Sequence, residues 1–136
     1  MNDRRFIISM HILTLMDHNQ GEWLSSDFMA SSMNINPVLV RKELSNLRKH
    51  GFIETKEGKN GGSMLKMSSD QIFLSDVYLS IADQGSFGKL LADPNPKCPV
   101  GRQINESIMK VNNTIEEVLV KELGRKTLAE FSSEFK

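Results

Sequence analysis

Residues 36–53 read NPVLVRKELSNLRKHGFI and carry the clearest structural signal in the chain. Asn36 can accept hydrogen bonds from the free N–H groups at a helix start, and Pro37 has the φ angle that a first helical residue needs. One apolar face recurs at helical spacing, namely Val40, Leu44 and Leu47. We expect this helix to run to about His50, with Gly51 as its C-cap.

Two helices are expected before residue 36. The first has an apolar face of Phe6, Ile7, Met10, Leu13 and Met16, and the turn-forming residues 17–21 end it. Residues 22–24 form a short extended piece. Ser25 or Ser26 then caps a short second helix, whose inward positions are Phe28, Met29 and Met33.

Two strands are expected after the helix, at residues 52–56 and 63–67, on either side of the turn EGKNGG at 57–62. Ser75 is expected to cap a fourth helix that carries Val77, Tyr78 and Ile81. Residues 84–101 contain three prolines and read mostly as a loop.

A long helix is expected from about residue 102 to residue 122, ended by Gly124, with a short terminal helix after it. Its apolar positions are spaced as a heptad seam: Ile104, Ile108, Val111, Ile115 and Val118. Such a seam in a chain of this size favours a homodimer, although packing on its own domain stays possible.

The order of elements predicts a mainly α fold with a small β-hairpin wing (α+β), that is, a winged helix-turn-helix followed by a long dimerisation helix. We expect a DNA-binding domain at 1–83, a linking loop with Cys98 at 84–101, and the dimerisation and terminal helices at 102–136.

A local excess of basic residues falls on the predicted helix-turn-helix and wing. The whole chain is neutral, with 17 basic and 17 acidic residues, but residues 36–67 hold seven basic and three acidic ones. An ordinary solvated helix face would show the same charges. Together with the order of elements, however, this local charge favours binding of double-stranded DNA.

The candidate DNA contacts are Asn36, Val38, Leu39, Arg41, Lys42, Ser45, Lys59 and Asn60. Arginine can bond to both acceptors of guanine, and asparagine can pair with adenine or hold a phosphate. Val38 or Leu39 could touch a thymine methyl group. Lys59 and Asn60 lie between glycines, which would let the wing approach the backbone or the minor groove.

Residues 36–53, with Gly58, Gly61 and Gly62, resemble the Rrf2 (Rrf-two) family of bacterial winged helix-turn-helix transcription regulators. The resemblance continues through residues 72–78 and reaches the long helix. It implies a dimer with two winged heads on a palindromic operator. We expect a homodimeric regulator of transcription, and a repressor rather than an activator. Members include iron–sulfur regulators, nitric-oxide-sensing repressors and a cysteine-metabolism repressor.

Many members of that family hold an iron–sulfur cluster with three cysteines in the loop before the dimer helix. This chain has only Cys98 there, so we expect no cluster and no other cofactor. His11, His18 and His50 are not expected to bind metal. Cys98 is a redox candidate, since Lys97 and the helix start beside it favour the thiolate, although an unreactive loop cysteine stays open as the alternative.

An enzyme is not expected, because the sequence lacks a phosphate-binding fingerprint, a metal-ligand spacing and a nucleophile elbow. Trp23 and Tyr78 are interpreted as packing residues. The sequence also lacks a signal peptide and an apolar run that could span a membrane, so we expect a cytoplasmic protein. Two alternatives stay open: a regulator with an effector pocket between head and long helix, and a winged-helix adaptor for proteins.

Overall fold

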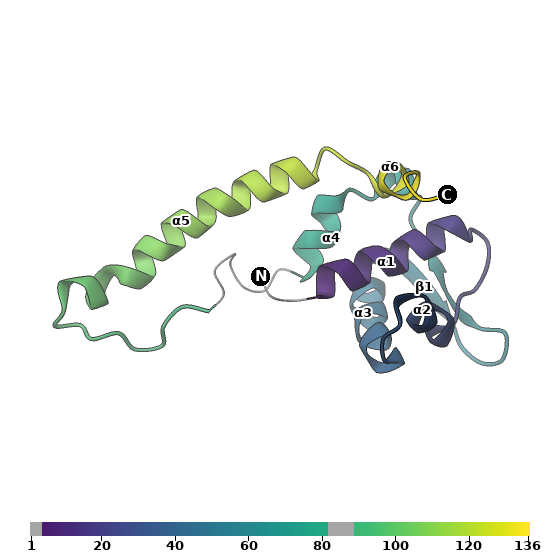
Figure 1. Ribbon diagram of the computed structural model, residues 1–136, viewed down its shortest axis with the longest axis horizontal. Coiled ribbons are helices and arrows are strands. Elements are labelled where there is room, and N and C mark those ends of the chain that lie inside the picture. The colour runs from purple at the N-terminus through teal and green to yellow at the C-terminus, as the bar shows by residue number, and fades with distance from the viewer. Residues whose placement is uncertain (1–3, 82–88) are drawn as a thin grey trace.

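The computed structural model describes residues 4–81 and 89–136. Its elements, in chain order, are α1 (Arg5–His18), α2 (Ser26–Met33), α3 (Pro37–Lys49), β1 (Ile53–Lys56), β2 (Gly62–Leu65), the 3-10 turn η1 (Ser69–Gln71), α4 (Leu74–Ile81), α5 (Pro99–Leu123) and α6 (Leu128–Ser132). Figure 1 shows a head of short elements and the single long helix α5, whose first half extends away from the head. The fold is therefore mainly helical with one hairpin, as expected.

The core of the head lies where α1, α2 and α3 meet. Ile12, Leu13, Met29 and Leu47 are fully buried there, because helical spacing places the apolar residues of each helix on one face. Asn36 caps α3 by accepting the N–H of Val38 at 2.9 Å. The sequence correctly predicted this helix and its cap.

The hairpin forms a two-stranded antiparallel sheet, with Ile53 opposite Leu65 and Lys56 opposite Gly62. Both strands are shorter than predicted. Leu24 pairs with Ser63 beside the sheet, which agrees with the extended piece expected at 22–24. Gly62 allows this approach, because a Cβ there would lie 2.5 Å from the Leu24 carbonyl oxygen.

The chain returns to the head after α5. Leu128 is fully buried in the core, its N–H donates to the Ile72 carbonyl at 2.7 Å, and the N–H of Leu74 donates to Lys126 at 3.0 Å. Thr127 and Glu130 form a capping box at the start of α6. The short terminal helix thus completes the core of the N-terminal elements.

Two predictions about single side chains were wrong. Phe28 was expected to face inward but is 46% exposed; α2 is short, and Met29 fills the core position next to it. Ser75 does not cap α4, because the helix already begins at Leu74 and Asp76 accepts the N–H of Phe73 instead.

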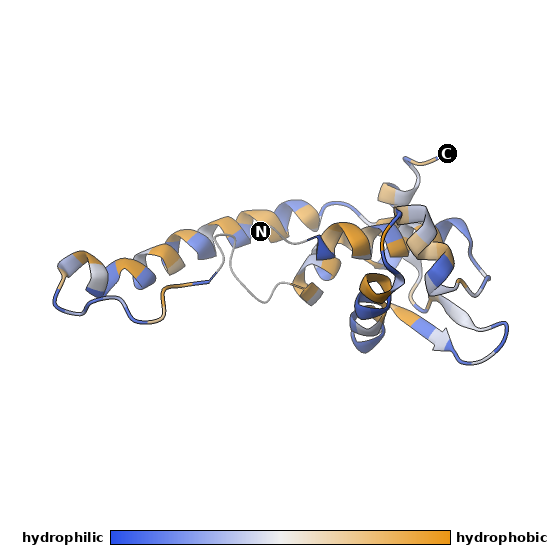
Figure 2. Ribbon diagram, turned by 60° about the horizontal axis from the view of Figure 1, so that its bottom comes forward, coloured by the Kyte–Doolittle hydropathy of each residue, from blue (hydrophilic) through white to orange (hydrophobic). Residues whose placement is uncertain are grey.

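The long helix α5 begins at Pro99 rather than near residue 102, with Cys98 as the N-cap residue. Proline occupies the first turn of this helix as Pro37 does in α3, and its fixed φ angle suits that position. Figure 2 shows apolar and polar residues alternating around α5 along its length. In the described part of the chain, no helix is long and apolar enough to cross a membrane.

Candidate nucleic-acid interface

The outer face of α3 presents the basic and polar residues predicted to meet DNA. Val38, Arg41, Lys42 and Ser45 are exposed, whereas Val40 and Leu47 point into the core. Arg41 also reaches α2, where its Nη1 lies 3.4 Å from the Ser26 hydroxyl. The helix therefore keeps an apolar face on the head and leaves a polar face toward solvent.

Two of the predicted contact residues, Asn36 and Leu39, also make contacts within the head. The side-chain oxygen of Asn36 is engaged in capping α3, so only its amide nitrogen remains as a candidate for a DNA contact. Leu39 is half-buried and packs against the core, so Val38, which is 57% exposed, is the better placed of the two apolar candidates.

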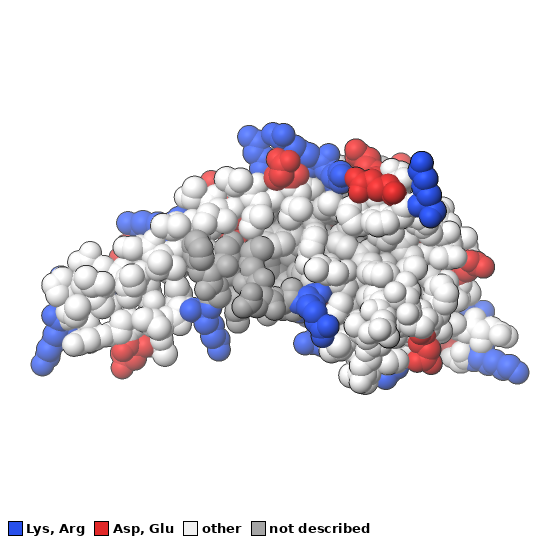
Figure 3. All heavy atoms as spheres, viewed as in Figure 1, with Lys and Arg blue, Asp and Glu red and all other residues white. Residues whose placement is uncertain are grey.

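The wing tip exposes Lys59 and Asn60 as predicted. Asn60 adopts a positive φ of 68°, and Gly58 one of 88°, so the tip turns sharply. At the base of the wing, the Lys56 ammonium lies 5.9 Å from the centre of the Trp23 ring. Trp23 is thus a packing residue, and it supports the hairpin. Figure 3 shows basic side chains at the wing on the lower right, and others on the opposite edge over the end of α5.

A small groove of about 210 Å³ separates α3 from the hairpin. Arg41, Ser45 and Arg48 line it from α3, and Thr55 lines it from β1. The guanidinium of Arg48 in this groove suits a phosphate of the DNA backbone. The sequence analysis did not include Arg48 and Thr55 among the candidate contacts. A signal for Arg48 was present, because it follows Arg41 by seven residues and shares its helix face.

The seam of α5 is largely uncovered in the single chain, where none of the helix is buried. Val111 is 50% exposed and Val118 is 64% exposed, while Ile104, Ile108 and Ile115 are half-buried. On a neighbouring face of α5, Glu116 accepts a hydrogen bond from the Tyr78 hydroxyl of α4 at 2.8 Å. The helix therefore packs on α4 along one side and presents an apolar stripe next to it.

Cys98 is exposed and carries a free thiol. Its side chain makes no capping hydrogen bond. The backbone N–H groups of Gly101 and Val100 nevertheless lower the pKa of the Cys98 thiol, because they stabilise the thiolate at the start of α5.

The three histidines are held by ordinary hydrogen bonds. His11 Nε2 lies 2.9 Å from the Ser32 hydroxyl, and burial lowers the pKa of His11. His18 and His50 contact the backbone carbonyls of Ser132 and Asn46, each at 2.9 Å. Among residues 4–81 and 89–136, there is no group of three His, Cys, Asp or Glu that could hold a metal ion.

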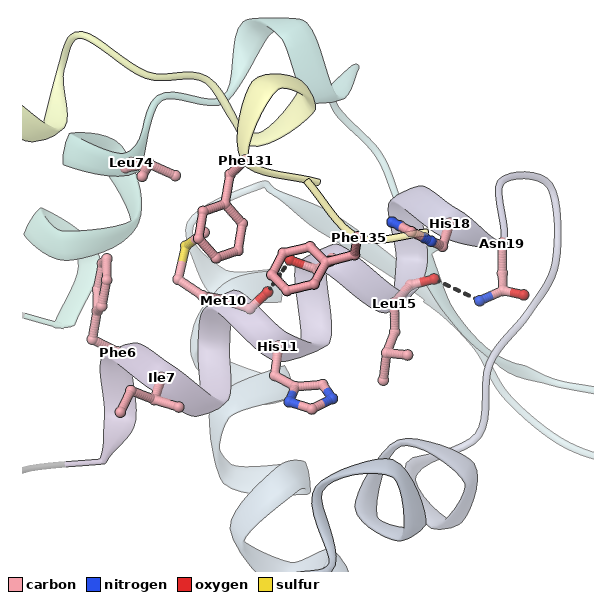
Figure 4. Close-up of a pocket in the computed structure, with 11 residues that line it drawn as sticks. Phe6, Ile7, Met10, His11, Leu15, His18, Asn19, Leu74, Phe131 and Phe135 are labelled. Carbon is pink, nitrogen blue, oxygen red and sulfur yellow. Dashed lines mark hydrogen bonds between the residues drawn. The ribbon is translucent and has the colours of Figure 1, made fainter. Parts of the chain in front are cut away.

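A larger pocket of about 780 Å³ lies against α1. Figure 4 shows Met10, His11 and Leu15 of α1 below it and Phe131 and Phe135 above it. Other residues that line it are Phe6, Ile7, Thr14, His18, Asn19 and Leu74. The pocket thus lies between α1 and the C-terminal segment, whereas the sequence analysis placed an effector pocket between the head and the long helix.

The comparisons with known proteins agree with this architecture. A family model described as Rrf2, iron-dependent transcriptional regulator, matches residues 2–134. YwnA of Bacillus subtilis (strain 168), whose name describes an HTH-type transcriptional regulator, is 34% identical over 128 residues, which is 94% of each chain. The match therefore spans the head, the wing and the long helix.

Two solved structures show the same fold. One, described as a transcriptional regulator from Lactobacillus plantarum, is 26% identical with a TM-score of 0.78, and the match covers 96% of this chain and 89% of that one. The other is CymR (YrzC), the global cysteine regulator of B. subtilis, at 20% identity and a TM-score of 0.70, covering 100% of this chain and 98% of that one.

The iron named in the family description does not fit the residues of this chain. The sequence holds a single cysteine, and the described residues hold no cluster of ligands around it. A thiolate-held iron–sulfur cluster needs several such ligands.

Proposed function

Because this chain belongs to the Rrf2 family of transcriptional regulators, we propose that it is a homodimeric, sequence-specific DNA-binding repressor that reads a palindromic operator in the cytoplasm. The observation that carries the proposal is the exposed polar face of α3 together with the groove between Arg41, Arg48 and the hairpin. Arg41, Lys42, Ser45 and Val38 read base edges, with the amide nitrogen of Asn36 beside them. Arg48, Lys59 and Asn60 hold the backbone.

The proposal is tested by fluorescence-anisotropy titration of the whole protein against duplex DNA from its own upstream region. A scrambled duplex of the same composition is the control, since phosphate contacts alone bind any sequence. We expect tight binding of the upstream duplex and much weaker binding of the scramble. No binding to either duplex would favour the adaptor function instead, and equal binding of both would contradict sequence-specific recognition of this upstream region.

We propose that α5 is the dimer contact, through Ile104, Ile108, Val111, Ile115 and Val118. The exposure of Val111 and Val118 supports this, because apolar side chains along a 25-residue helix gain most by packing on a second helix. A two-fold axis through this seam would present two α3 helices to two half-sites. The division of the chain into a DNA-binding domain (1–83), a linking loop (84–101) and a dimerisation segment (102–136) stays a prediction. Within the last segment, α6 packs on the head.

Cys98 is the proposed redox site. Its thiolate would attack one sulfur of an oxidised small thiol, forming a mixed disulfide and releasing the other thiolate, or would form a disulfide with the partner's thiol after oxidation. We expect a disulfide oxidant to change operator affinity of the parent protein, and Cys98→Ser to abolish that change while leaving the affinity of the reduced protein unaltered. An unchanged response in Cys98→Ser, measured by anisotropy with mass spectrometry of the thiol, would remove Cys98 from the mechanism.

A second candidate, regulation by a small molecule, is favoured by the pocket against α1. Its volume of about 780 Å³ suits a small ligand. Among residues 4–81 and 89–136, none that lines it is Asp, Glu, Lys or Arg, and burial favours the neutral form of His11. Phe6, Phe131 and Phe135 contribute aromatic walls. The ligand would therefore be uncharged and aromatic, since a charged one would lose its hydration without gaining a partner.

This candidate predicts that neutral 2-naphthol binds the protein in calorimetry and that 2-naphthoate, of similar size but charged, binds at least about tenfold more weakly. Phe135→Ala should weaken naphthol binding by roughly fivefold. Phe28→Ala is the control, because Phe28 is similarly exposed but does not line the pocket. Equal binding of both compounds would contradict the candidate. Dissociation of the proposed dimer by Ile7→Asp would also contradict it, because Ile7 lines the pocket and the pocket would then be a contact between two copies of the chain.

A further inference from the structure

The acidic residue of α3, Glu43, lies on the side of the helix that is turned away from the proposed DNA contacts, and it forms an ion pair with α1. α3 carries four basic residues and a single acid, Glu43. The Glu43 side chain is only 3% exposed, and at about 100° per residue it lies roughly opposite Arg41 on the helix. Arg5 Nε, at the first residue of α1, lies 3.1 Å from both carboxylate oxygens of Glu43.

We propose that the Arg5–Glu43 ion pair is a positioning element that sets the orientation of α3 on α1 and thereby the match between Arg41 and its base. This inference rests on the proposed function. Arg5 and Glu43 touch no base themselves; they act through the face of α3 that does.

Stability alone does not account for such a pair. A buried ion pair loses the hydration of both charges, and replacing it with apolar residues of similar volume is often neutral or stabilising. The pair does restrict the orientation of α3 on α1. Arg5 Nε contacts both carboxylate oxygens of Glu43, so a rotation of α3 about its axis would break the contact. An apolar pair at the same place would tolerate that rotation.

The pair also affects the electrostatic potential on the side of α3 that is proposed to face DNA. Since the Glu43 carboxylate is buried and paired with Arg5, the exposed side of α3 shows Arg41, Lys42, Arg48 and Lys49 without an opposing acid in the helix. A second link, from the Asn46 amide to the Ser80 carbonyl at 3.1 Å, holds the last turn of α3 on α4. These two contacts hold α3 on α1 and α4, in addition to the contact of Arg41 with Ser26 of α2.

The test uses the double variant Arg5→Met/Glu43→Leu of the whole protein, which keeps the net charge unchanged. The probes are a duplex that the parent protein selects from a random-sequence pool and a scramble of that duplex. We expect a thermal midpoint at or above that of the parent, affinity for the selected duplex lowered about tenfold, as for a lost base contact, and affinity for the scramble within about twofold.

A matched control removes an exposed pair instead, Lys110→Met/Glu106→Leu, whose charged atoms are 3.9 Å apart on the side of α5 opposite the seam. It should leave both affinities unchanged. If the buried double variant does not fold, Glu43→Gln replaces it; this variant keeps the shape and should lower selected-duplex affinity about threefold without changing the scramble.

Unchanged affinity of the folded double variant for the selected duplex would overturn the positioning role and leave the DNA-binding proposal intact. An equal loss on both duplexes would also overturn it, because that is the signature of lost phosphate contacts or of unfolding. Failure of the parent protein to select any sequence would overturn the proposed function and this inference together.

Discussion

Val111→Asp is expected to convert the proposed dimer into monomers and to remove operator binding at protein concentrations where the parent binds fully. Val111 is half-exposed in the single chain, so the substitution disturbs little in the head. In the dimer it would place a carboxylate in the α5 seam of each copy without a partner. We expect the dimer dissociation constant to rise by roughly 100-fold or more.

Analytical ultracentrifugation of both proteins over a range of concentrations measures this effect. The control is Asn113→Asp, because Asn113 is exposed and lies on the side of α5 opposite the seam. It adds the same charge to the same helix. If Val111→Asp remains a dimer, or if both variants dissociate alike, the seam is not the dimer contact.

Arg41→Ala is expected to weaken binding of the operator by about 1–3 kcal/mol and to leave binding of scrambled DNA nearly unchanged. The physical reason is that a guanidinium bonded to both acceptors of guanine distinguishes guanine from the other bases. Without it, the protein loses that discrimination. Arg41 is exposed on the outer face of α3, so the fold should not suffer.

Lys59→Ala supplies the contrast. Lys59 is on the wing tip, where it would contact a phosphate. Its removal should weaken binding to all duplexes alike, and should lower the slope of log affinity against log salt concentration by about one unit. Anisotropy titrations at several salt concentrations separate the two variants. Equal losses on operator and scramble for Arg41→Ala would reassign Arg41 to a phosphate.

The elements with strong local signals were predictable from the sequence. Asn36-Pro37 marked the start of α3 because cap and proline act within one turn, and the apolar spacing marked its buried face. The start of α5 at Pro99 was missed although the same rule applies, since the surrounding prolines and Cys98 favoured a loop. Phe28 was misplaced because a helix of eight residues has too few positions to define its buried face.

The contacts that need tertiary structure were not predictable. Glu43 occupies a position that helical spacing alone assigns to the apolar face, and nothing nearby in sequence shows that Arg5 meets it across 38 residues. The groove lined by Arg48 and Thr55 likewise exists only because the hairpin folds beside α3. Sequence reasoning gives the residue types on a surface, and long-range packing decides which of them come together.

The position of Leu128 in the core of the head has a consequence for how the protein is made. A ribosome releases α1, α2, α3 and the hairpin long before it reaches α6, so the head stays without one of its core side chains until synthesis is almost finished. Nascent chains that stop after α5 should therefore expose apolar surface and be open to proteolysis. The cell would accumulate only complete copies, and partial chains would not compete with them for DNA.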